Sequence, residues 1–436
     1  MKKKRIGWRS PALVAATSLA LMGPACAAPS DAERIADLER KLELLTQRLL
    51  QVEGGTTARS DKTPSASAEK SAASATAQTP EPEPSASHAH AAPAARHAEN
   101  GVPIRAFVDV VYARDKPDPT GRKGGFGVGT VDLYMTPSFG DHVKSIIELV
   151  FEQEEDGSMV VDLERVQLGY TFSDALTAWA GRFHTPLGSW NAAFHHGAQI
   201  QTSVLRPRFI AFEDQGGILP EHAVGLLGSG SVPLAGGRLK YDLFFGNGTP
   251  IVDGVLTVSG YKDDDNKKML GGNLRHEFGG SLEGLTLGVH ALSTQVSAYD
   301  AAGAVLGRTR LNVGGGFATL ERNGWELMGE YYAFRNRDLA GGTGTHASWA
   351  AFGQVGYTVA DAVTPYARFE KAALDQTDSY FANMNSGRSY QRTSVGLRYE
   401  LNATTALKLE VGHTREDQGG IDVKSRGLRA QVAARF

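Results

Sequence analysis

Cysteine is almost missing from this chain, since Cys26 is the only one among 436 residues. A single cysteine excludes a disulfide-stabilised scaffold and a zinc or redox site built from CxxC pairs. The chain also has no large excess of one charge, since 45 basic residues are balanced by 48 acidic residues. The basic excess typical of a nucleic-acid-binding protein is therefore absent from the sequence. After residue 28 no stretch approaches the roughly 18 continuous apolar residues that a membrane-spanning helix requires.

Recognisable catalytic motifs are also lacking. The sequence contains no GxSxG elbow, no phosphate-binding P-loop and no HExxH zinc motif. His195 and His196 are adjacent, but no carboxylate stands at ligand spacing from them. We therefore expect neither an enzyme nor a cofactor, and no metal site in the folded domain.

Residues 1–27 have the pattern of a secretory signal peptide. Five basic residues precede the apolar stretch 11–22, which is too short to span a bilayer, and Ala25 and Ala27 fit a cleavage site. The alternative is a lipoprotein acylated at Cys26, but Gly23 stands where such sites normally have leucine. Cleavage after Ala27 would leave 40 basic and 48 acidic residues, a formal charge of −8, and no cysteine. A chain without cysteine suits the oxidising periplasm.

Residues 30–53 predict a short α-helical coiled coil. Ser30 and Glu33 form a capping-box pattern at its start, and two glycines follow its end. Apolar residues alternate at spacings of three and four, as an a/d seam does: Ile35, Leu38, Leu42, Leu45, Leu49 and Val52. An isolated helix of this length is marginal in water, so the seam predicts partner helices, and we expect a homotrimer. The alternative is a helix that packs on another part of the same chain.

Residues 54–100 predict a disordered linker. The segment consists mainly of Ala, Ser, Thr and Pro and has too few large apolar residues to form a core. His88, His90 and His97 suggest metal binding, but three imidazoles on a flexible tether have nothing to orient them. We interpret them as part of a solvated linker.

Residues 101–436 predict an all-β fold, a 16-stranded antiparallel transmembrane β-barrel that follows the coiled coil. Apolar and polar residues alternate along stretches of about ten residues, the length that crosses a bilayer as a tilted strand. Short turns alternate strictly with long polar connections, as in outer-membrane barrels with tight periplasmic turns. The long connections are expected to include 295–307, 336–346 and 414–426. The same pattern also allows fourteen or eighteen strands.

The longest connection, 185–218, carries a resemblance to a known family. It follows the strand end GRFHTPLG at 181–188 and contains RPRFIAFED at 206–214. These segments resemble the phosphate-selective porin O/P family of Gram-negative bacteria, and the coiled coil with its linker is similar to related trimeric porins that pass dicarboxylates. The resemblance implies a porin whose third loop folds into the lumen. Phosphate-specific members line the pore with lysines, and this loop contains none.

Inward positions of the expected strands carry both signs of charge in balance, which would orient polar solutes without strong ion preference. The basic positions are Arg165, Arg182, Lys240, Arg275, Arg310, Arg368, Arg398, Lys408 and Arg429, and the acidic positions are Asp109, Asp132, Glu148, Asp242, Glu277, Glu326, Glu330, Glu370 and Glu410.

Taken together, the sequence predicts an outer-membrane porin for passive diffusion of small polar or anionic solutes, in contact with membrane lipid and lipopolysaccharide. Its helix would lie in the periplasm. The expected constriction residues are Arg182, His184, His195, His196, Arg206, Arg208, Glu213 and Asp214. Arg206 and Arg208 would give a weak anion preference, unless they only anchor the loop to carboxylates of the wall. The alternative function is a non-conducting outer-membrane anchor that tethers the envelope through its periplasmic coiled coil.

Overall fold

The computed structural model describes residues 102–117, 123–154, 156–194, 197–258, 263, 267–342 and 344–436. The predicted signal peptide, coiled coil and linker lie outside these residues, and so do His195 and His196. Among the described residues, no helix is both long enough and apolar enough to cross a membrane.

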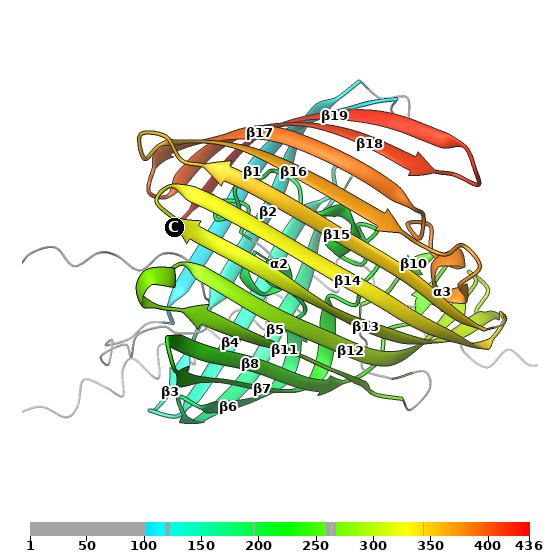
Figure 1. Ribbon diagram of the computed structural model, residues 1–436, viewed down its shortest axis with the longest axis horizontal. Coiled ribbons are helices and arrows are strands. Elements are labelled where there is room, and N and C mark those ends of the chain that lie inside the picture. Colours follow the sequence, from blue (N-terminus) through cyan, green and yellow to red (C-terminus); the bar gives the residue numbers. More distant parts are fainter. Residues whose placement is uncertain are drawn as a thin grey trace, which may run out of the picture. The chain divides into compact units, whose positions relative to one another are not determined.

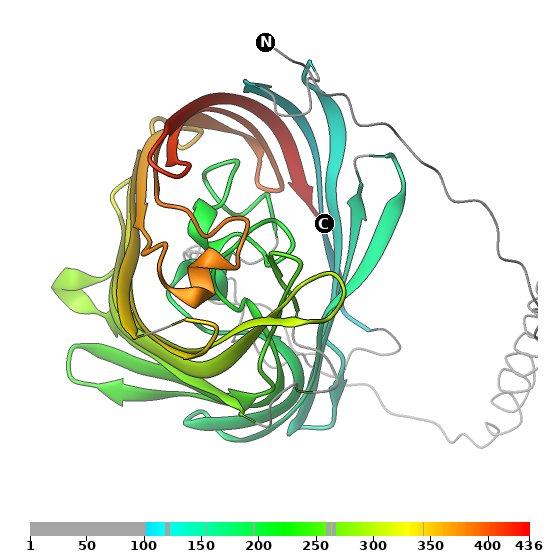
Figure 2. The same cartoon turned by 90° about the vertical axis from the view of Figure 1, so that its right-hand side faces the viewer.

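Sixteen long strands of the described residues form one closed antiparallel barrel, in which β1 pairs with β19 (Figures 1 and 2). They are β1 (Ile104–Lys116), β2 (Gly125–Met135), β4 (Val143–Gln153), β5 (Met159–Ser173), β6 (Leu176–His184), β7 (His222–Leu234), β8 (Gly237–Gly246), β11 (Met269–Phe278), β12 (Leu285–Tyr299), β13 (Val305–Arg322), β14 (Trp325–Ala340), β15 (Thr345–Tyr357), β16 (Val363–Ala373), β17 (Tyr390–Asn402), β18 (Thr405–Asp417) and β19 (Asp422–Arg435). The predicted strand number is therefore confirmed.

The described residues also form several shorter elements. The two-residue strands are β3 (Ser138–Phe139), which pairs with β4, and the hairpin of β9 (Ile251–Val252) and β10 (Val255–Leu256) in the connection after β8. The helices are α2 (Trp190–Ala193) and α3 (Ser379–Ala382), with 3-10 turns η1 (Arg208–Ile210) and η2 (Gly280–Leu282).

The strands place apolar side chains outside the barrel and charged side chains inside. On β18, Leu409 and Val411 are about half exposed, whereas Lys408 and Glu410 are 3% and 1% exposed. Successive side chains of a strand point to opposite faces, so this alternation sorts the two kinds of residue. An outer face of this composition is compatible with lipid.

The short connections confirm the expected turns at one end of the barrel. Between β13 and β14 the turn is Asn323-Gly324, and both residues have a positive φ, +52° and +80°. This is the Asn-Gly turn whose twist matches that of the two strands it joins.

Three expected long connections, 295–307, 336–346 and 414–426, are wrong. The strands extend into these segments, so that the connections are only 300–304, 341–344 and 418–421. The β12–β13 ladder, for example, extends through polar pairs such as Gln295 with Arg310 and Ser297 with Arg308. Backbone hydrogen bonding in a hairpin requires no apolar side chain. A prediction from the alternation of apolar and polar residues therefore ends these strands too early. The longest strand, β13, has 18 residues instead of the expected ten or so.

Candidate functional site

The connection between β6 and β7 lies within the ring of strands, where Figure 2 shows its green ribbon inside the barrel. We call residues 185–221 the inner loop. Two glycines, one on β6 and one at the start of the inner loop, are required by the structure. Gly181 has φ +137°, and a Cβ there would stand 1.9 Å from the carbonyl oxygen of Val166. Gly188 has φ +72°, and its Cβ would meet the Glu330 carboxylate and the Tyr332 hydroxyl at about 2 Å. Only glycine tolerates these positions.

The first part of the inner loop is held by Glu330 of β14. Its carboxylate accepts hydrogen bonds from the N–H groups of Ser189 and Trp190, at 3.1 and 2.6 Å. The Tyr332 hydroxyl donates to the same carboxylate at 2.7 Å. Helix α2 therefore begins on a buried wall carboxylate.

The middle of the inner loop is held by charged side chains of β17 and β18. Arg398 donates to the carbonyl oxygen of Gln201 at 2.8 Å, and Lys408 donates to that of Ser203 at 3.2 Å. Glu410 accepts from the N–H groups of Val204 and Leu205, at 3.0 and 3.2 Å. Each of these wall residues was expected to face the lumen, and here they bind loop backbone.

The next part of the inner loop, residues 205–209, is held in the same manner by side chains of β16 and β17. Arg368 donates to the carbonyl oxygen of Leu205 at 2.8 Å, and Glu370 accepts from the N–H of Arg208 at 2.7 Å. The Tyr390 hydroxyl accepts from the N–H of Phe209 at 3.0 Å. Backbone polar groups that leave water need such partners, so these side chains fix the path of the loop.

Apolar side chains of the inner loop pack against the same wall. Trp190, Phe209 and Ile210 are at most 1% exposed. The Trp190 ring meets that of Phe352 edge-on, with centroids 5.7 Å apart. The Phe209 ring meets that of Tyr332 at 5.4 Å. Burial of such large side chains contributes about 1.5–3 kcal/mol each, which explains why an apolar loop stays inside the barrel.

The two loop arginines have different surroundings. Arg206 is buried, with Nη2 3.7 Å from a Glu221 carboxylate oxygen and the guanidinium 4.1 Å from the centre of the Phe212 ring. Burial lowers the pKa of Arg206, and it raises the pKa of Glu221 well above its usual range, although each opposes the shift of the other. Arg208 pairs with Glu416 of β18, and its side chain is 28% exposed. Both contacts match the anchoring alternative, and the Arg208 side chain remains partly exposed.

Of the remaining expected site residues that the structure describes, Arg182 and His184 lie on β6, whereas Glu213 and Asp214 belong to the inner loop. Arg182 lies 3.8 Å from Glu164, and His184 lies 3.6 Å from Glu148. Glu213 accepts hydrogen bonds from the N–H groups of Glu221 and His222, at 2.8 and 2.9 Å. Asp214, the next residue, is exposed.

Sequence reasoning missed Glu164 and His222 as members of this group. The structure shows why they belong together: His184 is the last residue of β6, His222 is the first residue of β7, and the two are directly paired across the ladder. Their separation of 38 positions in the sequence conceals this pairing.

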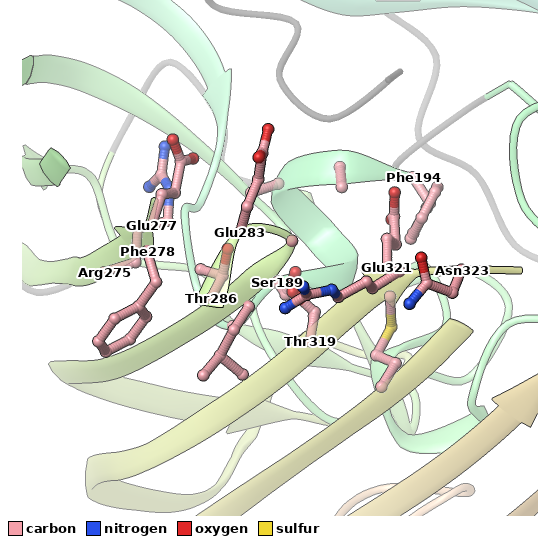
Figure 3. Close-up of a pocket in the computed structure, with 17 residues that line it drawn as sticks. Ser189, Phe194, Arg275, Glu277, Phe278, Glu283, Thr286, Thr319, Glu321 and Asn323 are labelled. Carbon is pink, nitrogen blue, oxygen red and sulfur yellow. The ribbon is translucent and has the colours of Figure 1, made fainter. Parts of the chain in front are cut away.

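A cavity of 640 Å³ lies between α2 and the short-turn ends of β11–β14 (Figure 3). Figure 3 shows the polar side chains Ser189, Glu283 and Glu321 around it, together with Arg275 and Glu277. The lining thus combines both signs of charge. Such a lining suits polar solutes in general more than ions of one sign.

Solved structures of other proteins share this fold. No protein-family model matches the sequence, and no curated protein does so either. Among solved structures, an anion-selective porin from Comamonas acidovorans is 13% identical with a TM-score of 0.52, and the match covers 77% of this chain and 99% of that porin. The outer-membrane channel DcaP of Acinetobacter baumannii is 11% identical with a TM-score of 0.50, over 77% and 97%.

Identities this low carry information about the fold alone. The resemblance to the phosphate-selective porin O/P family stays a prediction, and so does the absence of an enzymatic activity. The described part of the chain is a closed 16-stranded antiparallel barrel with the fold of outer-membrane porins.

Proposed function

We propose that this protein is an outer-membrane channel for passive diffusion of small polar or anionic solutes, and that the segment 185–218 narrows its lumen. The observation that carries the proposal is the bonding of the inner-loop backbone to charged wall residues, of which Glu330, Glu410 and Arg398 are examples. A barrel with an apolar outer face and a charged inner face is the pattern of a water-filled passage. Two structural neighbours are named as a porin and as a channel.

Selectivity in this proposal comes from the residues at the narrowing: Arg182, His184, His195, His196, Arg206, Arg208, Glu213 and Asp214. Guanidinium groups in a partly dehydrated passage attract anions more than the same groups in bulk water, because the effective dielectric constant is lower. Arg182 and Arg208 have side chains 20% and 28% exposed, so they carry most of this effect. Their carboxylate partners cancel part of the field, so the expected anion preference is weak.

The proposal also covers assembly and location. The barrel would lie in the outer membrane, surrounded by lipid and lipopolysaccharide, as a homotrimer whose N-terminal coiled coil lies in the periplasm. The heptad seam from Ile35 to Val52 supports this arrangement, because it needs partner helices.

Liposome swelling tests the function. Purified folded protein is reconstituted into vesicles, and swelling is followed with a neutral sugar, an amino acid, phosphate and a dicarboxylate of graded sizes. We expect swelling with the small solutes and slower swelling as solute size increases. If correctly folded protein produces no swelling with any of them, the alternative gains support: an outer-membrane anchor that tethers the envelope through its coiled coil.

A further inference from the structure

Three potential metal ligands stand in one row across neighbouring strands at the two ends of the inner loop. His184 is the last residue of β6 and His222 the first of β7, and they are paired in the ladder. Glu164 of β5 completes the row. The ligand atoms of these three residues all lie within 4.8 Å of one another, and each side chain is at most 7% exposed.

A β-bulge turns Glu164 into this row. The β4–β5 register passes from Glu148 opposite Arg165 to Leu149 opposite Leu163, so Glu164 is the extra residue. As a result both Glu164 and Arg165 face inward, although consecutive residues of a regular strand point to opposite faces. Bulges commonly re-aim a side chain in this way beside functional sites.

We propose that Glu164, His184 and His222 form a binding site for a first-row divalent transition metal ion, with zinc as the best fit. Two imidazoles and one carboxylate are a known zinc ligand set that leaves a fourth position for water. Zinc–ligand bonds of about 2.0–2.2 Å would place the ligand atoms about 3.4 Å apart in a tetrahedral site. Small side-chain rotations bridge the difference from the present spacing.

The surroundings of His222 fit the role of a ligand. Its Nε2 faces Glu164, while its Nδ1 lies 2.9 Å from a carboxylate oxygen of Glu213. In metal sites a ligating histidine normally donates its other ring N–H to such a carboxylate, which orients the ring. Glu213 belongs to the inner loop, so the ion would connect the loop to three strands.

The charge balance of the cluster also favours a cation. Four carboxylates lie here, those of Glu148, Asp162, Glu164 and Glu213, against the guanidinium groups of Arg165 and Arg182. With both histidines neutral, two negative charges are left over. A divalent metal ion would offset them, and a proton on His222 would offset one of them, which makes a protonated histidine the rival explanation.

Zinc binding to the full-length folded protein in detergent distinguishes a metal site from a protonated His222. The background variant carries alanine at His88, His90, His97, His195 and His196, so that other histidines do not contribute. After chelator treatment and removal of the chelator, zinc content per chain and the dissociation constant are measured. The visible spectrum with cobalt reports ligand number. We expect one ion per chain and the spectrum of a four-coordinate site.

Substitutions locate the ion. His184→Ala and Glu164→Gln should abolish stoichiometric binding, and the amide keeps the size of the carboxylate in case the alanine variant does not fold. Glu213→Gln should weaken affinity about 10–100-fold, as loss of an orienting partner does. His290→Ala is the matched control, since His290 is another buried histidine on β12, and it should bind as the background does.

Two results would overturn the proposal. One is a background variant that binds no zinc at stoichiometric level, which leaves the protonated histidine as the explanation. The other is binding that persists unchanged in folded His184→Ala and Glu164→Gln proteins.

Discussion

The carboxylate of Glu330 accepts the N–H of Trp190 at 2.6 Å, although the two residues stand 140 positions apart in the sequence. One lies on strand β14 of the wall and the other begins helix α2 of the inner loop. The contact joins the inner loop to a buried carboxylate of the wall. The proposed constriction therefore depends on wall carboxylates as much as on the loop itself.

Glu330→Ala should loosen the inner loop. The change removes the acceptor for Ser189 and Trp190, and hydrogen bonds to charged groups contribute about 1.5–3 kcal/mol each. We expect noisier single-channel current with frequent short openings to a higher level, and a lower unfolding midpoint. Current recordings and thermal unfolding check these two effects.

Asp109→Ala is the control for that change. Asp109 is also a buried inward carboxylate, but it accepts from Thr130 and Gln431, which belong to neighbouring strands. Its loss should lower stability without adding current noise. Equal noise in both variants would show that the Glu330 contacts do not position the loop.

Arg206→Ala and Arg208→Ala should have separable effects. Loss of Arg206 removes its hydrogen bond to the Ile210 carbonyl oxygen and its contact with the buried Glu221 carboxylate, so we expect a lower unfolding midpoint. Loss of the more exposed Arg208 should instead reduce anion preference. Reversal potentials in a salt gradient measure the second effect. An unchanged permeability ratio and an unchanged conductance in Arg208→Ala would place this residue outside the constriction.

The outer connection between β16 and β17 should respond to acid. Asp375 accepts hydrogen bonds from the Thr377 hydroxyl and N–H, at 2.6 and 2.9 Å, and lies 3.0 Å from His346. These contacts, the Thr377 hydroxyl above all, hold the pKa of Asp375 below its usual value of 3.8. A depressed pKa gives stability that is present above the unfolded-state pKa and is lost as the pH falls through the folded-state pKa.

We therefore expect residues 374–389 to become mobile only below about pH 4, as measured by hydrogen exchange. In Thr377→Val the pKa of Asp375 should return toward 3.8, so the segment should be less protected at neutral pH and its protection should fall less as the pH is lowered. Identical pH profiles for the two proteins would contradict this assignment.

The alternation along strands such as β18 could be predicted because successive residues face the outside and the inside of the barrel in turn, and the two faces differ in polarity. The alternation also predicted short turns at one end of the barrel, and Asn323-Gly324 is such a turn. The extended ends of β12 and β13 could not be predicted, because backbone pairing continues there through polar residues that show no apolar alternation.

The partners of the inner loop were beyond sequence reasoning. Glu410 was expected at an inward position, but its bond to Val204 joins residues 206 positions apart and depends on the folded path of the loop. The different roles of Arg206 and Arg208 have the same origin. They are two positions apart, yet one faces Glu221 and the other Glu416.

Leu42→Asp together with Leu45→Asp should abolish association of the N-terminal helices while the barrel remains folded. A charge in the a/d seam removes the burial that joins the helices. Cross-linking of the N-terminal segment should give trimers for the wild type and monomers for the variant, and far-UV circular dichroism should show the same β content. Only monomers in the wild type would contradict the proposed trimer.

Single-channel conductance in planar bilayers tests the central claim most directly. The wild type is compared with a variant in which residues 189–216 are replaced by a short Gly-Ser connection. We predict discrete conductance steps for the wild type and larger, less ion-selective steps for the shortened variant, because the narrowing segment has gone. Folded wild-type protein without steps, or steps of equal size in both proteins, would contradict the account.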